Sequence, residues 1–283
     1  MNQQLKDQVD QQKKSWDKYS KGWKKWDAIL TKSINPVSEK MIESLHVNGN
    51  EKVLDVASGT GEPGITLSKL LKQGSINAID LSEKMVAIAN ERAHELGCNN
   101  YKSEVAESSE IPFDDSHFDD ILCRFGVMFF PDLKSSLQEF ARVLKPGGTL
   151  VLAVWASPDK NPFVSVMSMP IVEKLSLPRP LPDAPGIFRF AKPGLLKEIV
   201  TDAGFKEVSE LTVSGEIVYD SPEHYWELMS DVAGPVMEAL KNAPAEVVDD
   251  VKKTVLNKVA GNESNGKFPL KWEAIIVKGV KAV

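Results

Sequence analysis

The stretch KVLDVASGTGEPG, residues 52–64, decides the fold of this chain. Its first part, 53–57, is short, apolar and rich in β-branched residues, which predicts a buried strand. Gly59 and Gly61 predict a tight turn after it, because glycine allows positive φ and close backbone approach. Pro63 suits the first turn of a helix, where a backbone N–H has no acceptor. The stretch therefore predicts a strand, a glycine turn and a helix start that presents free N–H groups to a ligand.

Two classes of ligand could use this turn. Gly59, Gly61 and Gly64 form a GxGxxG pattern, and Asp80 follows about 20 residues later, as in dinucleotide-binding turns. Asp55, among apolar neighbours, would repel a pyrophosphate but attract an ammonium or sulfonium group. NAD(P) and S-adenosylmethionine are therefore both candidates, and Asp55 favours S-adenosylmethionine.

The same residues resemble the first motif of the class I S-adenosylmethionine-dependent methyltransferases, an acidic residue followed by GxGxG-like glycines. The motif stands here as Asp55, Ala57, Gly59 and Gly61, with Ala57 in place of the family's first glycine. Its alternative is a glycine turn with only a structural role.

A second segment, RVLKPGGTLVL at 142–152, resembles the helix-to-fifth-strand turn of the same class. The resemblance covers about 50–156 firmly and 190–213 loosely. It is closest to the ubiquinone and menaquinone C-methyltransferase-like (type 11) group, which acts on small molecules.

Strands and helices alternate after the first motif. Strands are expected near 52–57, 75–81, 100–105, 118–124 and 149–155, and helices near 63–73, 83–97 and 133–144. This rhythm predicts an α/β fold with a parallel sheet covered on both faces, whose ligands bind at the carboxyl ends of the strands. The alternating segment 270–280 predicts a final strand. The resemblance implies a Rossmann-like, seven-stranded, mostly parallel sheet in which that last strand is antiparallel.

The chain is expected to divide into four parts. They are an N-terminal helical lid (1–48), the cofactor-binding core (49–156), a cap insertion (157–190), and the C-terminal part of the sheet (191–283) with a helical insertion at about 217–267. We expect the polar residues 1–14 to fray and Asn35-Pro36 to separate two helices of the lid. The dense prolines of 156–190, Pro180 and Pro182 among them, predict an irregular cap. The later insertion is expected to hold two helices, one opening at Ser221-Pro222 and one over 245–259.

Asp80, at the end of the second predicted strand, can accept hydrogen bonds from both hydroxyls of a ribose. Both candidate cofactors carry that ribose. The alternative role of Asp80 is a helix N-terminal acid. We expect Leu81 and Met85 to flank the adenine.

The segment after the third strand resembles a methyltransferase motif in which an acidic residue stands between two small ones. Here the three are Ala106, Glu107 and Ser108. The resemblance implies that Glu107, in place of the usual Asp, accepts the adenine amino group. A solvated loop glutamate is the alternative.

Arg124 and Phe125 end the fourth predicted strand, beside the expected place of the cofactor's methionine part. Arg124 could pair with the cofactor carboxylate or with an anionic substrate. It could equally be bridged to Asp119 or Asp120.

Methyl transfer needs positioning and exclusion of water more than a nucleophilic residue, so a cage is expected and a triad is not. A hydroxyl or activated-carbon acceptor would also need a base. Tyr19, on an aromatic helix face, and His224, in the second insertion, are the candidate catalytic groups, and packing or exposure on a helix is the alternative for each. The aromatic and methionine content of the caps favours an apolar or aromatic acceptor, although the same residues serve packing. A non-catalytic S-adenosylmethionine-binding module and an NAD(P)-dependent oxidoreductase remain alternatives.

Composition limits the other classes of function. The chain has 283 residues, 42% of them hydrophobic, and a net charge of −6. Its lysines are dispersed, so a nucleic-acid partner is not expected. No apolar run approaches the ~20 residues of a membrane span, and no secretory signal opens the chain, so cytoplasm is the expected location. Cys98 and Cys123 lack metal-ligand spacing, and no metal is expected.

Overall fold

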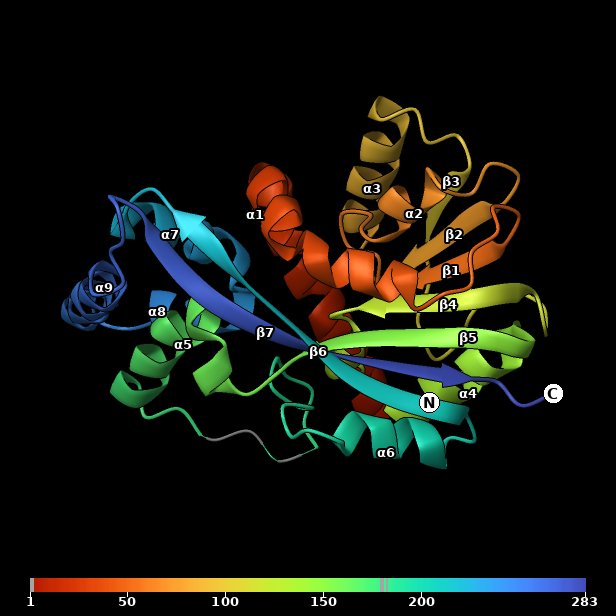
Figure 1. Cartoon of the computed structure of the whole chain (residues 1–283). Coiled ribbons are helices and arrows are strands. Elements are labelled where there is room, and N and C mark those ends of the chain that lie inside the picture. Colours follow the sequence, from red (N-terminus) through yellow and green to blue (C-terminus); the bar gives the residue numbers. More distant parts are fainter. Residues whose placement is uncertain (1–2, 179–180, 182) are drawn as a thin grey trace.

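The computed structural model describes residues 3–178, 181 and 183–283. Within them, seven strands form one sheet in the order β3-β2-β1-β4-β5-β7-β6 (Figure 1). The strands are β1 (Lys52–Val56), β2 (Ser75–Asp80), β3 (Tyr101–Val105), β4 (Phe118–Arg124), β5 (Leu144–Trp155), β6 (Lys206–Tyr219) and β7 (Phe268–Val280). β1 to β5 pair in parallel, and β7 is antiparallel to both β5 and β6. The predicted sheet and its antiparallel last strand are confirmed.

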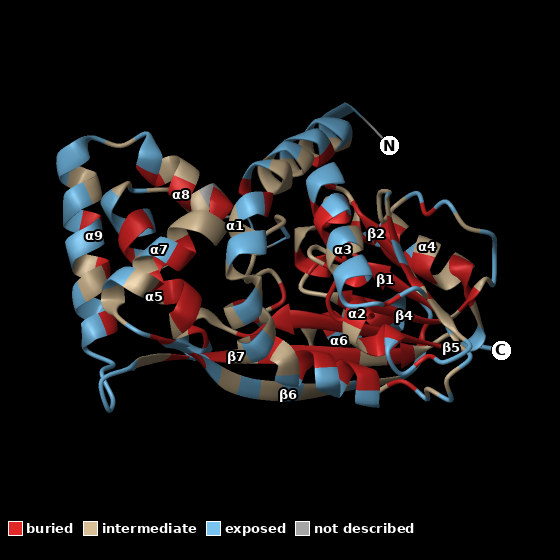
Figure 2. Cartoon of the chain, turned by 90° about the horizontal axis from the view of Figure 1, so that it is seen from above, coloured by how far each residue is buried: buried red, intermediate tan, exposed pale blue. Residues whose placement is uncertain are grey.

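The crossover helices cover both faces of the sheet. They are α2 (Gly64–Ser68), α3 (Glu83–Glu95), α4 (Leu133–Val143) and α6 (Leu195–Asp202). The strand order runs outward from β1 through β2 to β3 and then reverses to β4 and β5. Right-handed crossovers therefore place α2 and α3 on one face and α4 on the other. Figure 2 shows the strands other than β6 as mainly buried, β6 as intermediate to exposed, and the helices as exposed on their outer sides.

Several element boundaries differ from the expected ones. α2 ends at Ser68, although a helix was expected to 73, and turns complete the connection to β2. β5 begins at Leu144, five residues early, because Leu144 already pairs with Phe118 before the register shifts. α3 begins as predicted, with Ser82 as its N-cap accepting the N–H of Met85.

β6 and β7 extend beyond the rest of the sheet as a two-stranded ribbon, and this ribbon carries a group of helices. β7 pairs with β5 only as far as Ala274, opposite Trp155, and residues 268–273 pair with β6 alone. The overhanging ribbon leads into α7 (Pro222–Val232), α8 (Gly234–Lys241) and α9 (Ala245–Ala260), beside which lies α5 (Pro162–Lys174). We call these four helices the cap. Figure 1 places the cap beyond the carboxyl ends of the parallel strands.

The cap is more regular than expected. The expectation of an irregular segment at 157–190 was wrong over α5, a helix of 13 residues. Pro162 stands at its first position, where no N–H is needed, and Pro170 lies in its second half. Pro180 and Pro182 lie outside the described residues. In the second insertion α7 and α9 are confirmed, and α8 was not foreseen.

The N-terminal segment is one bent helix, α1 (Gln3–Glu43), of 41 residues. The expected fraying of 1–14 is wrong for residues 3–14, and the expected break at Asn35-Pro36 is also wrong. Pro36 costs a helix about 3 kcal/mol. Val37 and Met41, both fully buried, hold the turns beyond it against the core. We call α1 the lid, because it crosses between the sheet and the cap.

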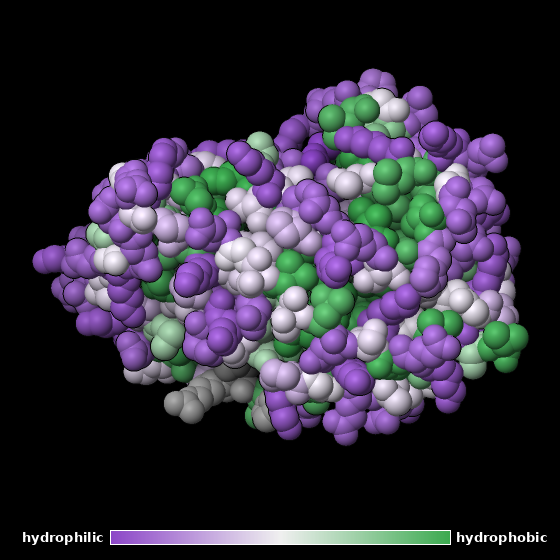
Figure 3. All heavy atoms as spheres, in the orientation of Figure 1, coloured by the Kyte–Doolittle hydropathy of each residue, from purple (hydrophilic) through white to green (hydrophobic). Residues whose placement is uncertain are grey.

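The surface seen in Figure 3 is mainly hydrophilic, with hydrophobic residues gathered in separate patches. Among the described residues, no helix has both the length and the apolar character that crossing a membrane would require.

Candidate active site

The site lies between β1 and β4, at the point where the strand order of the sheet reverses. Ligands of open α/β sheets bind at such a point. Ala57 follows β1 with φ 55°, and Phe125 follows β4 with φ 60°. The two strand ends approach closely, since a Cβ on Gly126 would lie 2.4 Å from the Cβ of Ala57. Only glycine fits at position 126, and the backbone of both strand ends is left-handed.

Two carboxylates hold the glycine turn. Asp80 accepts the N–H of Gly59 at 2.8 Å through one oxygen and the N–H of Ser82 at 2.8 Å through the other. Asp55 accepts the N–H of Gly64 at 3.0 Å. Gly59 has φ +54° and open space where a side chain would begin. The predicted residues Asp55, Gly59 and Asp80 are therefore brought together as one unit.

The carboxylate of Asp55 is buried and only partly hydrogen-bonded. It is 1% exposed, and its Oδ1 has no hydrogen-bond partner among the described residues. Burial raises its pKa to about 7, against the opposing effects of the Gly64 N–H and of Arg124. A buried carboxylate of this kind is stabilised by a cation. The ammonium group of S-adenosylmethionine meets that requirement, and a pyrophosphate does not.

Asp80 and its neighbours suit the nucleoside part of that cofactor. Burial raises the pKa of Asp80 to about 6. The N–H of Ala106 donates to the Asp80 carbonyl at 3.1 Å, which joins the ends of β2 and β3. Met85 is buried and Leu81 is partly exposed.

The acidic motif after β3 is ordered by its own serines. Glu107 accepts the Oγ–H of Ser109 at 2.6 Å and is partly exposed. The hydroxyl of Ser108 lies 2.9 Å from that of Ser136 on α4. The motif thus stands at the same edge as Asp80, and the contact of Glu107 with adenine stays a prediction.

Arg124 is not bridged to either alternative partner. Its guanidinium donates to the hydroxyl of Ser38 on the lid at 2.9 Å. Asp119 is instead paired with Lys145 at 2.6 Å, and Asp120 accepts the N–H of Thr149 at 3.2 Å. Burial lowers the pKa of Arg124, and the negative charges of Glu62 and Asp55 oppose that shift. Neither Asp119 nor Asp120 therefore competes with a ligand for the guanidinium of Arg124.

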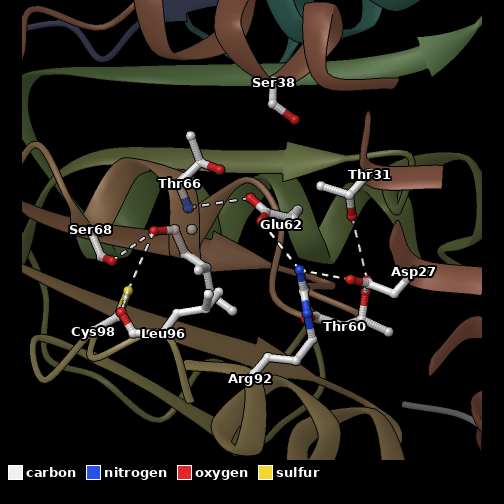
Figure 4. Close-up of polar contacts among 12 residues, drawn as sticks. Asp27, Thr31, Ser38, Thr60, Glu62, Thr66, Ser68, Arg92, Leu96 and Cys98 are labelled. Carbon is white, nitrogen blue, oxygen red and sulfur yellow. Dashed lines mark hydrogen bonds and ion pairs between the residues drawn. The ribbon is translucent and has the colours of Figure 1, made fainter. Parts of the chain in front are cut away.

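A partly buried ionic cluster that sequence reasoning missed ties the lid to the glycine turn (Figure 4). Asp27 of α1 accepts the hydroxyl of Thr60 at 2.9 Å and pairs with Arg92 of α3 at 2.8 Å. Arg92 also donates to the Thr60 carbonyl and lies 3.5 Å from Glu62. The only local signal was Glu62 beside the turn, because Asp27 and Arg92 come from distant helices.

The first half of the lid covers the edge of the sheet. Asp17 accepts the hydroxyl of Ser82 at 2.5 Å, and the backbone N–H of Ser82 donates to Asp80. On the other side, Gln12 donates to the Phe129 carbonyl at 2.6 Å, and the Trp16 and Phe129 rings lie 5.4 Å apart. The lid therefore reaches from the start of α3 to the residues that follow β4.

The two candidate catalytic residues lie in the interface of lid and cap. Tyr19 is buried, and its hydroxyl donates to Glu238 of α8. Burial raises the pKa of Tyr19, so the phenol keeps its proton and suits a donor rather than a base. The Nδ1 of His224 accepts the N–H of Asp220 at 3.1 Å, and its ring lies 5.3 Å from Trp26. A catalytic role for either residue stays a prediction.

The fold and the cofactor requirement of the site define a class I S-adenosylmethionine-dependent methyltransferase. Comparison with known proteins agrees, and the chain belongs to the ubiE/COQ5 methyltransferase family, whose model matches residues 3–173.

Two relatives resemble the chain in sequence. A demethylmenaquinone methyltransferase of Oceanobacillus iheyensis is 30% identical over 187 residues, covering 62% of this chain and 78% of the relative. A ubiquinone/menaquinone biosynthesis C-methyltransferase, UbiE, of Psychromonas ingrahamii is 30% identical over 204 residues, covering 67% and 80%.

The solved structures show the shared fold. A putative methyltransferase of Bacillus halodurans has a TM-score of 0.56 at 23% identity, with 87% of this chain and 99% of that one covered. The [4+2]-cyclase SpnF has a TM-score of 0.52 at 20% identity, with 87% and 81% covered. The fold alone therefore does not assign the acceptor.

Proposed function

We propose that this enzyme methylates a ring carbon of a reduced, quinol-type aromatic acceptor. The observation that carries the proposal is an aromatic cluster at the carboxyl edge. Phe125 and Trp155, at the ends of β4 and β5, stack with ring centroids 3.8 Å apart, and Phe163 of the cap lies 4.8 Å from Trp155. The names of the relatives, which include demethylmenaquinone methyltransferases, favour the same class of acceptor.

We also propose the residues that hold the cofactor. Asp55 and Arg124 would bind the ammonium and carboxylate of the methionine part, and Asp80 the ribose hydroxyls. Close backbone contact at the turn and the adenine surround would be supplied by Ala57, Gly59, Gly61, Leu81, Met85, Ala106, Glu107 and Ser108. The free Oδ1 of Asp55 and the unbridged Arg124 support this arrangement.

The chemistry accounts for the need for a reduced acceptor. S-adenosylmethionine supplies an electrophilic methyl group on a sulfonium sulfur. A quinone ring carbon is itself electrophilic, whereas the quinol is electron-rich and can attack. The acceptor carbon forms a C–C bond as the S–CH₃ bond breaks, and its proton then passes to a base. His224 is the predicted candidate, and its Nδ1 would have to release the N–H of Asp220 to take that proton. Lid and cap exclude water and align the two partners.

The test has two stages. Calorimetric titration with S-adenosylmethionine, S-adenosylhomocysteine, NADH and NADPH should show binding of the first two alone. Demethylmenaquinone, chemically reduced to its quinol, should then gain one methyl group on carbon, detected by mass spectrometry, and the unreduced quinone should not. Methylation on oxygen, or no transfer to the quinol, would overturn the proposed acceptor.

A further inference from the structure

Phe125 has a backbone conformation that an aromatic residue seldom adopts. Its φ of 60° lies in the left-handed region, which costs an L-residue roughly 1–2 kcal/mol. Such conformations persist where surrounding contacts impose them, and they concentrate at functional sites. Here the Phe125 N–H donates to the Ala153 carbonyl at 2.8 Å, which fixes the residue to β5.

The other non-glycine residues with positive φ differ in kind. Among the described residues they are Ala57, Ser116, Ser176, Glu207 and Asn265. Apart from Ala57, these are polar, and none has a bulky apolar side chain. Phe125 therefore needs a reason beyond the geometry of a turn.

Among the described residues, Phe125 has one stacked aromatic neighbour, Trp155. The plane of the Phe125 ring makes 10° with that of Trp155, a near-parallel stack. Trp155 is 5% exposed and is itself fixed by Phe163 and by Trp272, whose ring lies 6.2 Å away at 69°. Phe125 itself is partly exposed, whereas Trp155 behind it is buried, so the stack has a fixed inner ring and a partly accessible outer one.

Phe125 lies next to the residues proposed to hold the methionine part of the cofactor. Phe125 directly follows Arg124 and directly precedes Gly126, which contacts Ala57 at the end of β1. The residues that suit the methionine part of the cofactor thus adjoin the ring of Phe125. The first helix of the cap begins at Pro162, and its Phe163 packs against Trp155, the same ring on which Phe125 stacks.

We propose that Phe125 is the platform on which the acceptor ring stacks, and that Trp155 is the positioning residue behind it. This inference rests on the proposed function, because it needs an aromatic acceptor. The strained backbone turns the ring toward the donor side, and the stack holds the acceptor plane at a fixed height above it. Alignment of this kind supplies rate to a transfer that has no nucleophilic residue.

The test compares three variants of Phe125 with the wild type. Phe125→Leu keeps an apolar side chain but loses the flat face, and it should raise the KM for demethylmenaquinol about tenfold or more. Phe125→Tyr restores the face and should behave like the wild type. The dissociation constant for S-adenosylhomocysteine, measured by calorimetry, should stay within about twofold in both.

A second pair of variants separates the effect of the strained backbone from that of the ring. Phe125→Gly relieves the strained φ but removes the ring, so the KM for the quinol should rise by at least as much as in Phe125→Leu. Glu207→Gly, at φ 52° on exposed β6, relieves a similar conformation and should leave the KM unchanged. Chemical denaturation checks that all variants are folded.

The outcomes separate this inference from the proposed function. An inert wild type would overturn the acceptor class and the platform together. A wild type that methylates the quinol, with an unchanged KM in Phe125→Leu, would overturn the platform alone. A loss of S-adenosylhomocysteine affinity as large as the rise in KM would make Phe125 a cofactor residue instead.

Discussion

The glycine turn and the lid–cap interface are built from contacts of very different range. In the turn, Gly59 binds a carboxylate 21 residues away and Gly64 one that is 9 residues away. In the interface, Tyr19 meets Glu238 across 219 residues, and Trp26 donates to Asp231 across 205. The turn is therefore encoded locally, and the interface exists only once the sheet has brought both ends of the chain together.

The two regions also differ in how their charged side chains are buried and paired. The turn keeps Asp55 buried, and its Oδ1 has no hydrogen-bond partner in the part of the chain that the structure describes. At the interface the pairs are largely exposed, as for Lys25 with Glu227 and Asp231. Exposed pairs contribute about 0–1 kcal/mol each. We infer that the turn is organised for binding and that the interface depends on close packing.

The largest expected effect is on cofactor binding at the turn. Gly59→Arg should abolish detectable binding of S-adenosylmethionine, because the new side chain would enter the space over the turn. No atom lies within 4 Å of the place that a Cβ at position 59 would take, so the variant should fold, at the cost of its φ of +54°. Calorimetry and thermal denaturation measure the two effects.

Gly97→Arg is the matched control. Gly97 also has positive φ and open space, but it follows α3, away from the carboxyl edge. It should lose similar stability and keep full affinity. Equal loss of affinity in both variants would count against the assigned site.

Asp80→Ala should weaken S-adenosylmethionine binding by about a hundredfold, because charge-assisted hydrogen bonds contribute about 1.5–3 kcal/mol each. The protein should remain folded, although the N–H groups of Gly59 and Ser82 lose their acceptor. Asp120→Asn is the control. Burial raises the pKa of Asp120 to about 6 as well, but this residue lies near the opposite end of the strands. Calorimetric titration should show near-normal affinity for this control, and retained affinity in folded Asp80→Ala would remove Asp80 from the site.

Gly22→Ala tests the interface. A Cβ at Gly22 would lie 2.1 Å from the Asp231 carbonyl oxygen, so α1 and α7 would have to separate. We expect a loss of about 1–3 kcal/mol in the free energy of unfolding. A Gly→Ala change in an exposed helix would instead raise the free energy of unfolding by about 1 kcal/mol. The sign of the measured change therefore tests the contact between Gly22 and Asp231. Urea denaturation measures it, with Lys21→Ala on the exposed side of the same helix as control.

The smallest effect is the pH dependence of binding. With a pKa of about 7, Asp55 holds its proton below neutrality when no ligand is bound. A cationic ligand needs the carboxylate, so affinity should fall about tenfold between pH 7 and pH 6, and it should also fall above about pH 8, where the ammonium group of the ligand loses its own proton. Titrations in buffers of different ionisation enthalpy should show proton release on binding at pH 6. Asp55→Asn should bind more weakly and lose the fall on the acid side, and a wild-type profile that is flat there would contradict the role of Asp55.

The sequence by itself determined the parallel sheet, the glycine turn with Asp55 and Asp80, and the methyltransferase class. Periodicity, turn chemistry and short spacings are local properties, and they predict the alternating strands and helices. The seven-stranded sheet with its antiparallel last strand was implied by the resemblance to the methyltransferases. The start of α7 at Ser221-Pro222 is a local signal of the same kind.

Only the tertiary structure decided the course of the lid, the regularity of the cap and the strained stack of Phe125 on Trp155. A proline at position 36 predicts a break, but burial of Val37 and Met41 outweighs it. The pairing of Asp27 with Arg92 joins helices that are distant in sequence. Such contacts gain their free energy from burial shared between remote segments, and no window of sequence contains both partners.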